Sequence, residues 1–221
     1  MKVLLILISM MATMNACSTS RVSANTGNIP NPTVDAPLAT AKGEQTAVLA
    51  GGCFWGVEAV FEHVKGVVRV ESGYAGGEAG TAQYRKVSSG GTGHAESVQI
   101  TYDPSRVTYG QLLKVFFAVA HDPTQLNRQG PDWGTQYRSA IFYSNDEQKR
   151  IAEAYIEQLN KAKVFEGKIV TQLAKLESFH DAEDYHQDYL VNHPDQPYIV
   201  VHDMPKLENL KKYLPALYKG D

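Results

Sequence analysis

Apolar and polar residues after position 44 follow two different periods, and each period predicts one kind of element. Runs that are short and wholly apolar, or that alternate at every second residue, predict β-strands. Apolar residues that recur three and four positions apart predict helices. Strands are predicted at 46–50, 67–74, 95–102, 139–143 and 168–176. Helices are predicted at 54–65, 108–120, 144–163 and 182–192.

The boundaries of these elements carry cap and turn signals. Thr108 stands where an N-cap should stand, and Ser144 opens the spacing of a capping box. The glycine-rich residues 73–93 and the residues 121–136, with two Pro and two Gly, predict loops. Beyond the last helix, a proline-bearing tail should wrap around the rest. This mixture predicts one α+β domain at 45–221, a two-layer sandwich in which a mixed β-sheet packs against helices.

The first residues have a different character. Lys2, the apolar run at 3–8 and a small residue before Cys17 predict a secretory signal peptide at 1–16. This arrangement resembles the bacterial lipoprotein cleavage box, which implies that Cys17 is lipidated and that several acyl chains anchor the protein. An ordinary cleaved signal, with Cys17 incidental, is the alternative. Residues 17–44 are rich in Ser, Thr, Asn, Ala and Pro and predict a flexible linker.

Charge and hydrophobicity limit the classes of partner and the cellular location that we expect. The formal net charge is -3 and no block of Lys and Arg stands out, so a nucleic-acid partner is not expected. No apolar stretch of 18 residues follows position 20, and no transmembrane helix is expected there. A lipidated Cys17 would place the protein in the bacterial cell envelope, facing the periplasm. Ser18 stands where an inner-membrane retention signal has Asp, and so favours the outer membrane.

Cys53 is the first candidate for chemistry. It lies between a predicted strand and a predicted helix, and the N–H groups and dipole of a helix start favour an anion. We therefore expect a lowered pKa for the thiol and a reactive thiolate. A small, buried and inert Cys is the alternative. The large aromatic pair Phe54 and Trp55 directly after Cys53 favours a pocket at this place.

Glu96 is the second candidate. In a strand, Glu96, Val98, Ile100 and Tyr102 point to the same side, and three of these four residues are apolar or aromatic. A carboxyl group buried with them would have a raised pKa and could act as a general acid near neutral pH. A solvated position at the frayed end of the strand is the alternative, and the spacing alone leaves both open.

The motifs around these two residues resemble a known family. The sequence Gly-Cys-Phe-Trp-Gly at 52–56 is similar to the signature of type A peptide methionine sulfoxide reductases. Further stretches resemble that family in the same order, at 73–77, 84–85, 92–96, 102–104, 121–123, 134–139 and 182–187. The matches run from about residue 46 to about residue 205. The resemblance implies a ferredoxin-like core with a long wrapping C-terminal coil.

The resemblance also implies roles for the matching residues. Cys53 would attack the sulfoxide sulfur, and Glu96 would protonate the sulfoxide oxygen. The other implied site residues bind substrate: Tyr84 and Tyr137 hold the oxygen, Asp132 binds near the substrate backbone, and Phe54 and Trp55 enclose the S-methyl group. The implied substrate is the S epimer of methionine sulfoxide, free or in oxidised proteins, so the implied reaction is protein repair.

The chain departs from many members of that family at its C-terminal end, because residues 213–221 contain no resolving cysteine. With Cys17 lipidated, Cys53 is the one free thiol and should be left as a sulfenic acid. We expect an external thiol, a thioredoxin-like protein or a small thiol, to reduce it. No cofactor is expected, and we expect a monomer.

Two other classes of protein are alternatives to this interpretation. A Cys-His hydrolase would need a base from among His94, His121, His180 and His186. A non-catalytic lipoprotein binding module would have an unreactive, buried Cys53. A thioredoxin-like enzyme lacks its C-x-x-C, and the Cys and His residues lack the spacing of a metal site.

Overall fold

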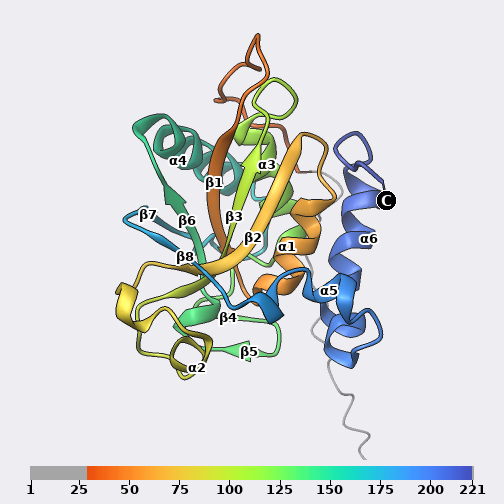
Figure 1. Cartoon of the computed structure of the whole chain (residues 1–221). Coiled ribbons are helices and arrows are strands. Elements are labelled where there is room, and N and C mark those ends of the chain that lie inside the picture. The colour runs from red at the N-terminus through yellow and green to blue at the C-terminus, as the bar shows by residue number, and fades with distance from the viewer. Residues whose placement is uncertain (1–28, 221) are drawn as a thin grey trace, which may run out of the picture.

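A computed structural model describes residues 29–220 of the chain. The expected signal peptide at 1–16, Cys17 and the first part of the expected linker lie outside the described residues. A six-stranded sheet in the order β7-β6-β1-β3-β2-β8 forms the centre (Figure 1). Its strands are β1 (Gln45–Gly51), β2 (Val67–Ala75), β3 (Ala95–Tyr102), β6 (Ser139–Tyr143), β7 (Gln172–Lys175) and β8 (Phe179–Asp181). Only the β6–β7 pair is parallel among the described pairs of this sheet, so the expected mixed sheet is confirmed.

The register of β1 against β3 positions the chemistry. Leu49 pairs with Val98 in this antiparallel ladder. If this register is continued by two residues, Glu96 lies level with Gly51, where β1 ends and the chain turns toward Cys53. The alternation along both strands sends Leu49 and Val98 into the larger core and their sequence neighbours to the opposite face.

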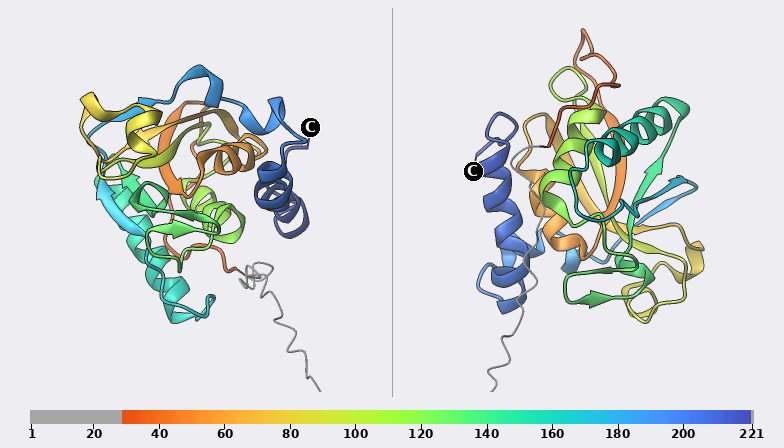
Figure 2. Two further views of the ribbon diagram at one scale, coloured as in Figure 1. Left: turned by 90° about the horizontal axis from the view of Figure 1, so that it is seen from below. Right: turned by 180° about the vertical axis from the view of Figure 1, so that it is seen from behind.

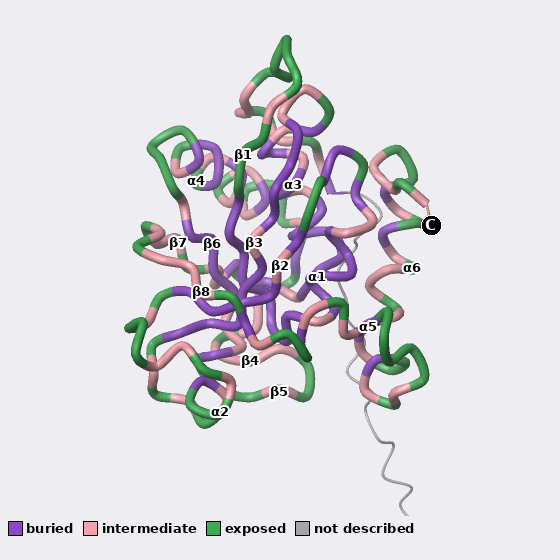
Figure 3. Tube along the Cα trace, viewed as in Figure 1, coloured by how far each residue is buried: buried purple, intermediate pink, exposed green. Residues whose placement is uncertain are grey.

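Helices cover one face of the sheet and complete the two layers (Figures 1 and 2). They are α1 (Phe54–Glu62), α3 (Tyr109–Val115) with the π-helix η3 (Phe116–Ala120), and α4 (Asp146–Lys161). Their apolar side chains and those of β1, β2 and β3 form the larger core, and the central strands are the most buried part of the trace (Figure 3). A smaller cluster, built largely of Ala, lies on the opposite face. None of the described helices has the length and apolar character needed to cross a membrane.

Short elements occupy the connections that were expected to be loops. They are η2 (Ala79–Thr81), α2 (Tyr84–Val87), β4 (Arg128–Gln129), β5 (Asp132–Trp133) and η4 (Thr135–Tyr137). The expected helix at 182–192 is two pieces, η5 (Asp184–His186) and α5 (Tyr189–Asn192). Asp188, whose φ is +53°, separates the pieces, because a left-handed residue cannot continue a right-handed helix.

The two predicted N-caps, at the starts of α3 and α4, differ in their outcome. Thr108 and Gln111 form a capping box at the start of α3, as expected for Thr108. At α4 the N-cap is Asn145, not Ser144. The Asn145 side chain accepts a hydrogen bond from the Gln148 N–H at 2.9 Å. Asn is at least as good an N-cap as Ser, so the sequence signal lay one residue further along the chain.

The expected linker is shorter than predicted. Residues 29–44 form no helix or strand, yet they pack on the domain. Ile29 is buried, the Tyr155 hydroxyl donates to the Pro30 carbonyl at 2.8 Å, and Asp35 accepts a hydrogen bond from the Gly110 N–H at 2.9 Å. A flexible linker that reaches residue 44 is therefore wrong. Single contacts of this kind have no period, so the composition of the segment could not reveal them.

The long C-terminal coil is also wrong. After η6 (Ile199–Asp203, a π-helix) the chain forms α6 (Met204–Tyr213), which packs against α1 (Figure 1). Leu207, Leu210 and Leu214 recur at three and four positions and face the core. Pro205 lies in the first turn of α6, where its missing N–H costs nothing, so it starts the helix instead of breaking it.

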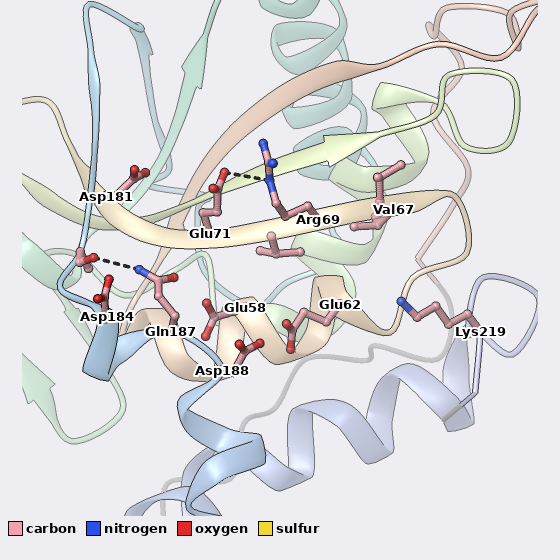
Figure 4. Close-up of a pocket in the computed structure, with 13 residues that line it drawn as sticks. Glu58, Glu62, Val67, Arg69, Glu71, Asp181, Asp184, Gln187, Asp188 and Lys219 are labelled. Carbon is pink, nitrogen blue, oxygen red and sulfur yellow. Dashed lines mark hydrogen bonds and ion pairs between the residues drawn. The ribbon is translucent and has the colours of Figure 1, made fainter.

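Acidic side chains gather in a pocket between α1 and β2 (Figure 4). Burial raises the pKa of Glu58 to about 7, and the charge of Asp188 adds to this. Burial likewise raises the pKa of Glu62 to about 8, with Asp188 and Glu58 contributing. Both carboxyl groups are therefore more easily protonated in the folded chain than in the unfolded chain. Their contribution to stability is present below pH 4.5 and is lost as the pH rises through about 7 to 8.

We expect Glu58→Gln to stabilise the protein at pH 9 and to leave it nearly unchanged at pH 5. Glu58 is 1% exposed, and Gln fills the same space without a charge. Each 1 kcal/mol gained should raise Tm by roughly 2–4 °C in a domain of this size. Thermal unfolding at both pH values measures the effect, with the exposed Glu208→Gln as the control. Equal Tm changes at pH 5 and pH 9 would contradict the assigned pKa.

Candidate active site

Cys53 occupies the N-cap position of α1, directly after β1. The turn between them needs Gly52, whose φ of +96° is strained for any residue with a side chain. A Cβ at Gly52 would also lie 2.6 Å from the Cβ of Gln129, so the loop of β4 closes on this turn. The predicted junction of strand and helix is confirmed, and it brings the thiol to the start of α1.

The environment of Cys53 opposes ionisation in the substrate-free protein. The side chain is buried, at 7% exposed. Burial raises the pKa of the Cys53 thiol well above its usual value, and the charges of Glu96 and Asp203 raise it further. The Trp55 backbone N–H and the Lys206 ammonium act in the opposite direction. The expected lowered pKa is wrong, because desolvation outweighs the N–H groups at the helix start.

Glu96 faces inward beside Cys53, at 2% exposed. Its Oε2 accepts a hydrogen bond from the Phe54 N–H at 3.2 Å, which ties the carboxyl to the residue next to the thiol. Burial raises the pKa of Glu96 to about 8, and the charges of Asp132 and Asp203 contribute. The solvated alternative is excluded, and the carboxyl is protonated at neutral pH.

Two tyrosines reach the same place from different elements. Tyr84 begins α2, and Tyr137 ends η4. Burial raises the pKa of each hydroxyl, and the charges of Glu96 and Cys53 raise it further, so each interacts with both groups. Both hydroxyls are therefore neutral and able to donate hydrogen bonds. Glu183 helps to hold Tyr84, because its Oε1 accepts from the Tyr84 N–H at 2.9 Å.

Phe54 and Trp55 form an aromatic wall with residues from η5 and α5. The Trp55 ring stacks on Tyr189, with ring centroids 3.7 Å apart. The Trp55 Nε1–H donates to Nδ1 of His186 at 3.2 Å. The His186 ring also lies 5.1 Å from Phe54 and 4.3 Å from Tyr84, between centroids. His186 thus fixes the orientation of Trp55.

Asp132 lies in β5, half-buried at the edge of this group. The Tyr198 hydroxyl donates a hydrogen bond to Oδ2 of Asp132. Burial raises the pKa of Asp132, while the Tyr198 hydrogen bond and Lys206 oppose this. Tyr198 was missed in the sequence, because it belongs to a tail that was expected to be a coil. All the predicted site residues in the described part of the chain thus converge.

The four histidines that could serve as the base of a Cys-His enzyme make their hydrogen bonds to groups other than the Cys53 thiol. His94 contacts the Glu78 carbonyl, His121 the Ser139 hydroxyl, His180 the Ser178 hydroxyl and His186 the Trp55 indole. Burial also lowers the pKa of His121 to about 4. Within residues 29–220, no group of three or more His, Cys, Asp or Glu side chains could hold a metal ion.

Comparison with known proteins agrees with this geometry. The sequence profile of the family described as peptide methionine sulfoxide reductase matches residues 45–216. The peptide methionine sulfoxide reductase MsrA 2 of Mesorhizobium japonicum is 61% identical over 178 residues, which cover 80% of this chain and 91% of that protein. The MsrA 2 of Synechocystis is 55% identical over 186 residues, covering 83% of this chain and 87% of that one.

Solved structures show the same fold. The reduced form of Mxr1 from Saccharomyces cerevisiae superimposes with a TM-score of 0.62 at 35% identity, covering 76% of this chain and 94% of that one. Methionine sulfoxide reductase A of Corynebacterium diphtheriae gives 0.61 at 36% identity, covering 75% and 86%. With its Cys53 and Glu96 beside an aromatic wall, the chain belongs to the peptide methionine sulfoxide reductase family, type A, and is a peptide-methionine (S)-S-oxide reductase that repairs oxidised proteins.

Proposed function

We propose that Cys53 attacks the sulfoxide sulfur while Glu96 donates its proton to the sulfoxide oxygen. The observation that carries this proposal is the protonated Glu96 carboxyl, buried and bound to the Phe54 N–H beside the thiol. A neutral Glu96 does not oppose the ionisation of Cys53, so one of the two negative charges acting on the thiol is absent at neutral pH. The acid and the nucleophile therefore support each other.

The electrons and protons of this step balance. The Cys53 sulfur bonds to the sulfoxide sulfur as the sulfoxide oxygen takes the proton of Glu96. The S–O bond of the sulfoxide then breaks as the hydroxyl passes to the Cys53 sulfur, and the bond between the two sulfurs breaks. Methionine leaves in the reduced form, and Cys53 is oxidised by two electrons to a sulfenic acid. The proton that the thiol releases restores the Glu96 acid. No step needs a metal ion or a bound cofactor.

The surrounding side chains would hold the substrate. The neutral hydroxyls of Tyr84 and Tyr137 can donate hydrogen bonds to the sulfoxide oxygen before it is protonated. Phe54 and Trp55 present aromatic surface suited to the S-methyl group. Asp132, oriented by the Tyr198 hydroxyl, would bind near the backbone of the oxidised residue.

Glu96→Gln should slow the chemical step by about 10²–10⁴-fold, the usual contribution of a general acid. The decline of the single-turnover rate at alkaline pH should also disappear, because Gln has no proton to lose. Rapid-quench measurement of methionine formation across pH 6–10 tests both effects. The exposed Glu157→Gln is the control, and Cys53→Ser should abolish reduction while the fold remains. An unchanged rate in Glu96→Gln at neutral pH would remove this residue from the mechanism.

The resolving step is assigned to an external thiol. Cys53 is the free cysteine among the described residues, and the C-terminal segment that packs on α1 contains none. A thioredoxin-like protein or a small thiol would attack the sulfenic acid, releasing water and forming a mixed disulfide that a second thiol reduces. Cys53 is only 7% exposed, so this attack has to reach a nearly closed site.

A single turnover without reductant should leave a sulfenic acid on Cys53 that dimedone traps. The reason is that residues 29–220 contain no thiol besides Cys53. Mass spectrometry of the peptide that contains Cys53 measures the adduct, and the dithiothreitol-treated enzyme is the control. A disulfide between Cys17 and Cys53 in place of the adduct would overturn the external resolution.

We further propose that the enzyme is a monomer held by a lipidated Cys17 at a membrane of the bacterial cell envelope, facing the periplasm and preferably at the outer membrane. The support is the signal-like sequence at 1–16 followed directly by Cys17. Ile29, the first described residue, is already buried in the domain, so at most residues 18–28 connect Cys17 to the enzyme.

Cys17→Ser should move the enzyme from the membrane fraction to the soluble fraction, because the lipid would have no attachment point. Reductase activity per folded molecule should stay the same, since the catalytic group lies in the described domain. Fractionation of cells followed by an activity assay measures both quantities. A wild-type protein that is already soluble would contradict the anchor and leave the catalytic proposal untouched.

A further inference from the structure

A buried ion pair lies beside Cys53 and has no part in the mechanism described so far. Asp203 ends η6, and Lys206 lies in the first turn of α6. The Lys206 Nζ donates to Oδ1 of Asp203 at 2.9 Å. The Asp203 side chain is 0% exposed and that of Lys206 is 17% exposed. Taking both charges out of water is costly, so a pair in this place calls for an explanation.

The pair is seated on the first turn of the catalytic helix. A Cβ on Gly56 would lie 2.1 Å from Oδ1 of Asp203 and 2.8 Å from Nζ of Lys206. The missing side chain of Gly56 thus makes the niche into which both charged groups fit. Gly56 is three residues from Cys53, so the niche opens on the same helix turn as the thiol.

One carboxylate oxygen of the ion pair makes no hydrogen bond within the described residues. Oδ2 of Asp203 is buried and has no hydrogen-bond partner in the described residues. Most buried polar groups are satisfied, and an exception is often linked to a function. This free oxygen belongs to a carboxylate whose charge acts on both Cys53 and Glu96.

Both charges act on Cys53, in opposite directions, and each also acts on at least one further carboxyl group. The negative charge of Asp203 makes proton loss harder at Glu96 and at Cys53. The positive charge of Lys206 acts on Cys53 and on Asp132, and it favours their ionised forms. Burial lowers the pKa of Lys206, but Asp203, Cys53 and Asp132 together raise it above its usual value, so the ammonium stays charged.

We propose that Asp203 and Lys206 are positioning residues of the reductase, in which the carboxylate keeps the Glu96 acid protonated and the ammonium offsets the negative charge on the Cys53 sulfur. Asp203 opposes proton loss at Cys53 as well as at Glu96, and the Lys206 ammonium would reduce this opposition at Cys53. The C-terminal segment thereby becomes part of the active site. This inference rests on the proposed attack by Cys53.

The groups that face the two reacting residues come from several elements. They are Asp203 from η6, Lys206 from α6, Asp132 from β5, Tyr74 from β2, Tyr84 from α2, Tyr137 from η4 and Tyr198 from the residue before η6. The tyrosines stay neutral because burial raises the pKa of each. Removing the charge of Asp203 or of Lys206 therefore shifts the pKa of Cys53 in a direction that can be stated in advance.

The test is the pH dependence of Cys53 alkylation by iodoacetamide in the full-length enzyme without sulfoxide. Lys206→Met should move the midpoint to higher pH, and Asp203→Asn should move it to lower pH. The Lys206 ammonium favours the ionised form of Cys53, so alkylation of Lys206→Met at pH 7 should be slower, by roughly tenfold. Lys211→Met, on the exposed side of α6, should match the wild type.

A second readout separates this role from a structural one. In Asp203→Asn, the alkaline decline of the single-turnover rate should move to lower pH, because Glu96 loses its proton more easily. The double variant Asp203→Asn/Lys206→Met removes both charges together, and its alkylation midpoint should lie between those of the single variants.

Equal midpoints in the wild type and both single variants, or shifts in the same direction, would overturn the proposal. A double variant that does not fold would assign the pair to stability and would also overturn it. Because alkylation needs no substrate, these outcomes are independent of whether Cys53 and Glu96 carry out the reduction.

Discussion

The structure depends on bringing an ionisable sulfur and a protonated carboxyl into one water-poor place. The antiparallel register of β1 and β3 sets Glu96 level with the end of β1, and the left-handed Gly52 turns the chain there so that Cys53 begins α1. The Phe54 N–H then binds the carboxyl. The same burial that keeps the proton on Glu96 also opposes the ionisation of Cys53, so one constraint both enables and limits the chemistry.

The rest of the domain serves this place through elements that are distant in sequence. Short segments after the main strands bring in Tyr84, Tyr137 and Asp132, and the tail brings in Tyr198 and the pair of Asp203 and Lys206. The tail packs as a helix on α1, so its side chains are held by the same core that holds the thiol. A site assembled from so many segments needs a rigid frame, which the two-layer packing provides.

Much of this could be predicted from the sequence where the signal is local. The strands at 95–102 and 139–143 were predicted to the residue, because the pattern of each strand and the turn or cap signal after it are local in the sequence. Cys53, Glu96, Phe54 and Trp55 were found because their neighbours form motifs. The pKa of Cys53 was predicted in the wrong direction, because the helix start is visible in the sequence and the burial that outweighs it is not.

Contacts between distant segments could not be predicted in the same way. Asp35 on Gly110 and Asp203 on Gly56 depend on how the chain ends dock, and neither has a sequence period. Helix α6 did have a sequence period, in Leu207, Leu210 and Leu214, but the prolines of the C-terminal tail suggested a coil. The S epimer and the reaction came from the resemblance, and the roles of the matching residues are proposed from the geometry.

The central claim is that burial keeps the Glu96 carboxyl protonated beside Cys53 in the resting enzyme. Titration of the ¹³C-labelled Glu96 side-chain carboxyl by NMR, with Glu96→Gln used to assign the signal, tests it most directly. A midpoint near pH 8 is the predicted result. A midpoint near the ordinary value of 4.5 would show a carboxylate that cannot supply the proton, and would contradict the account.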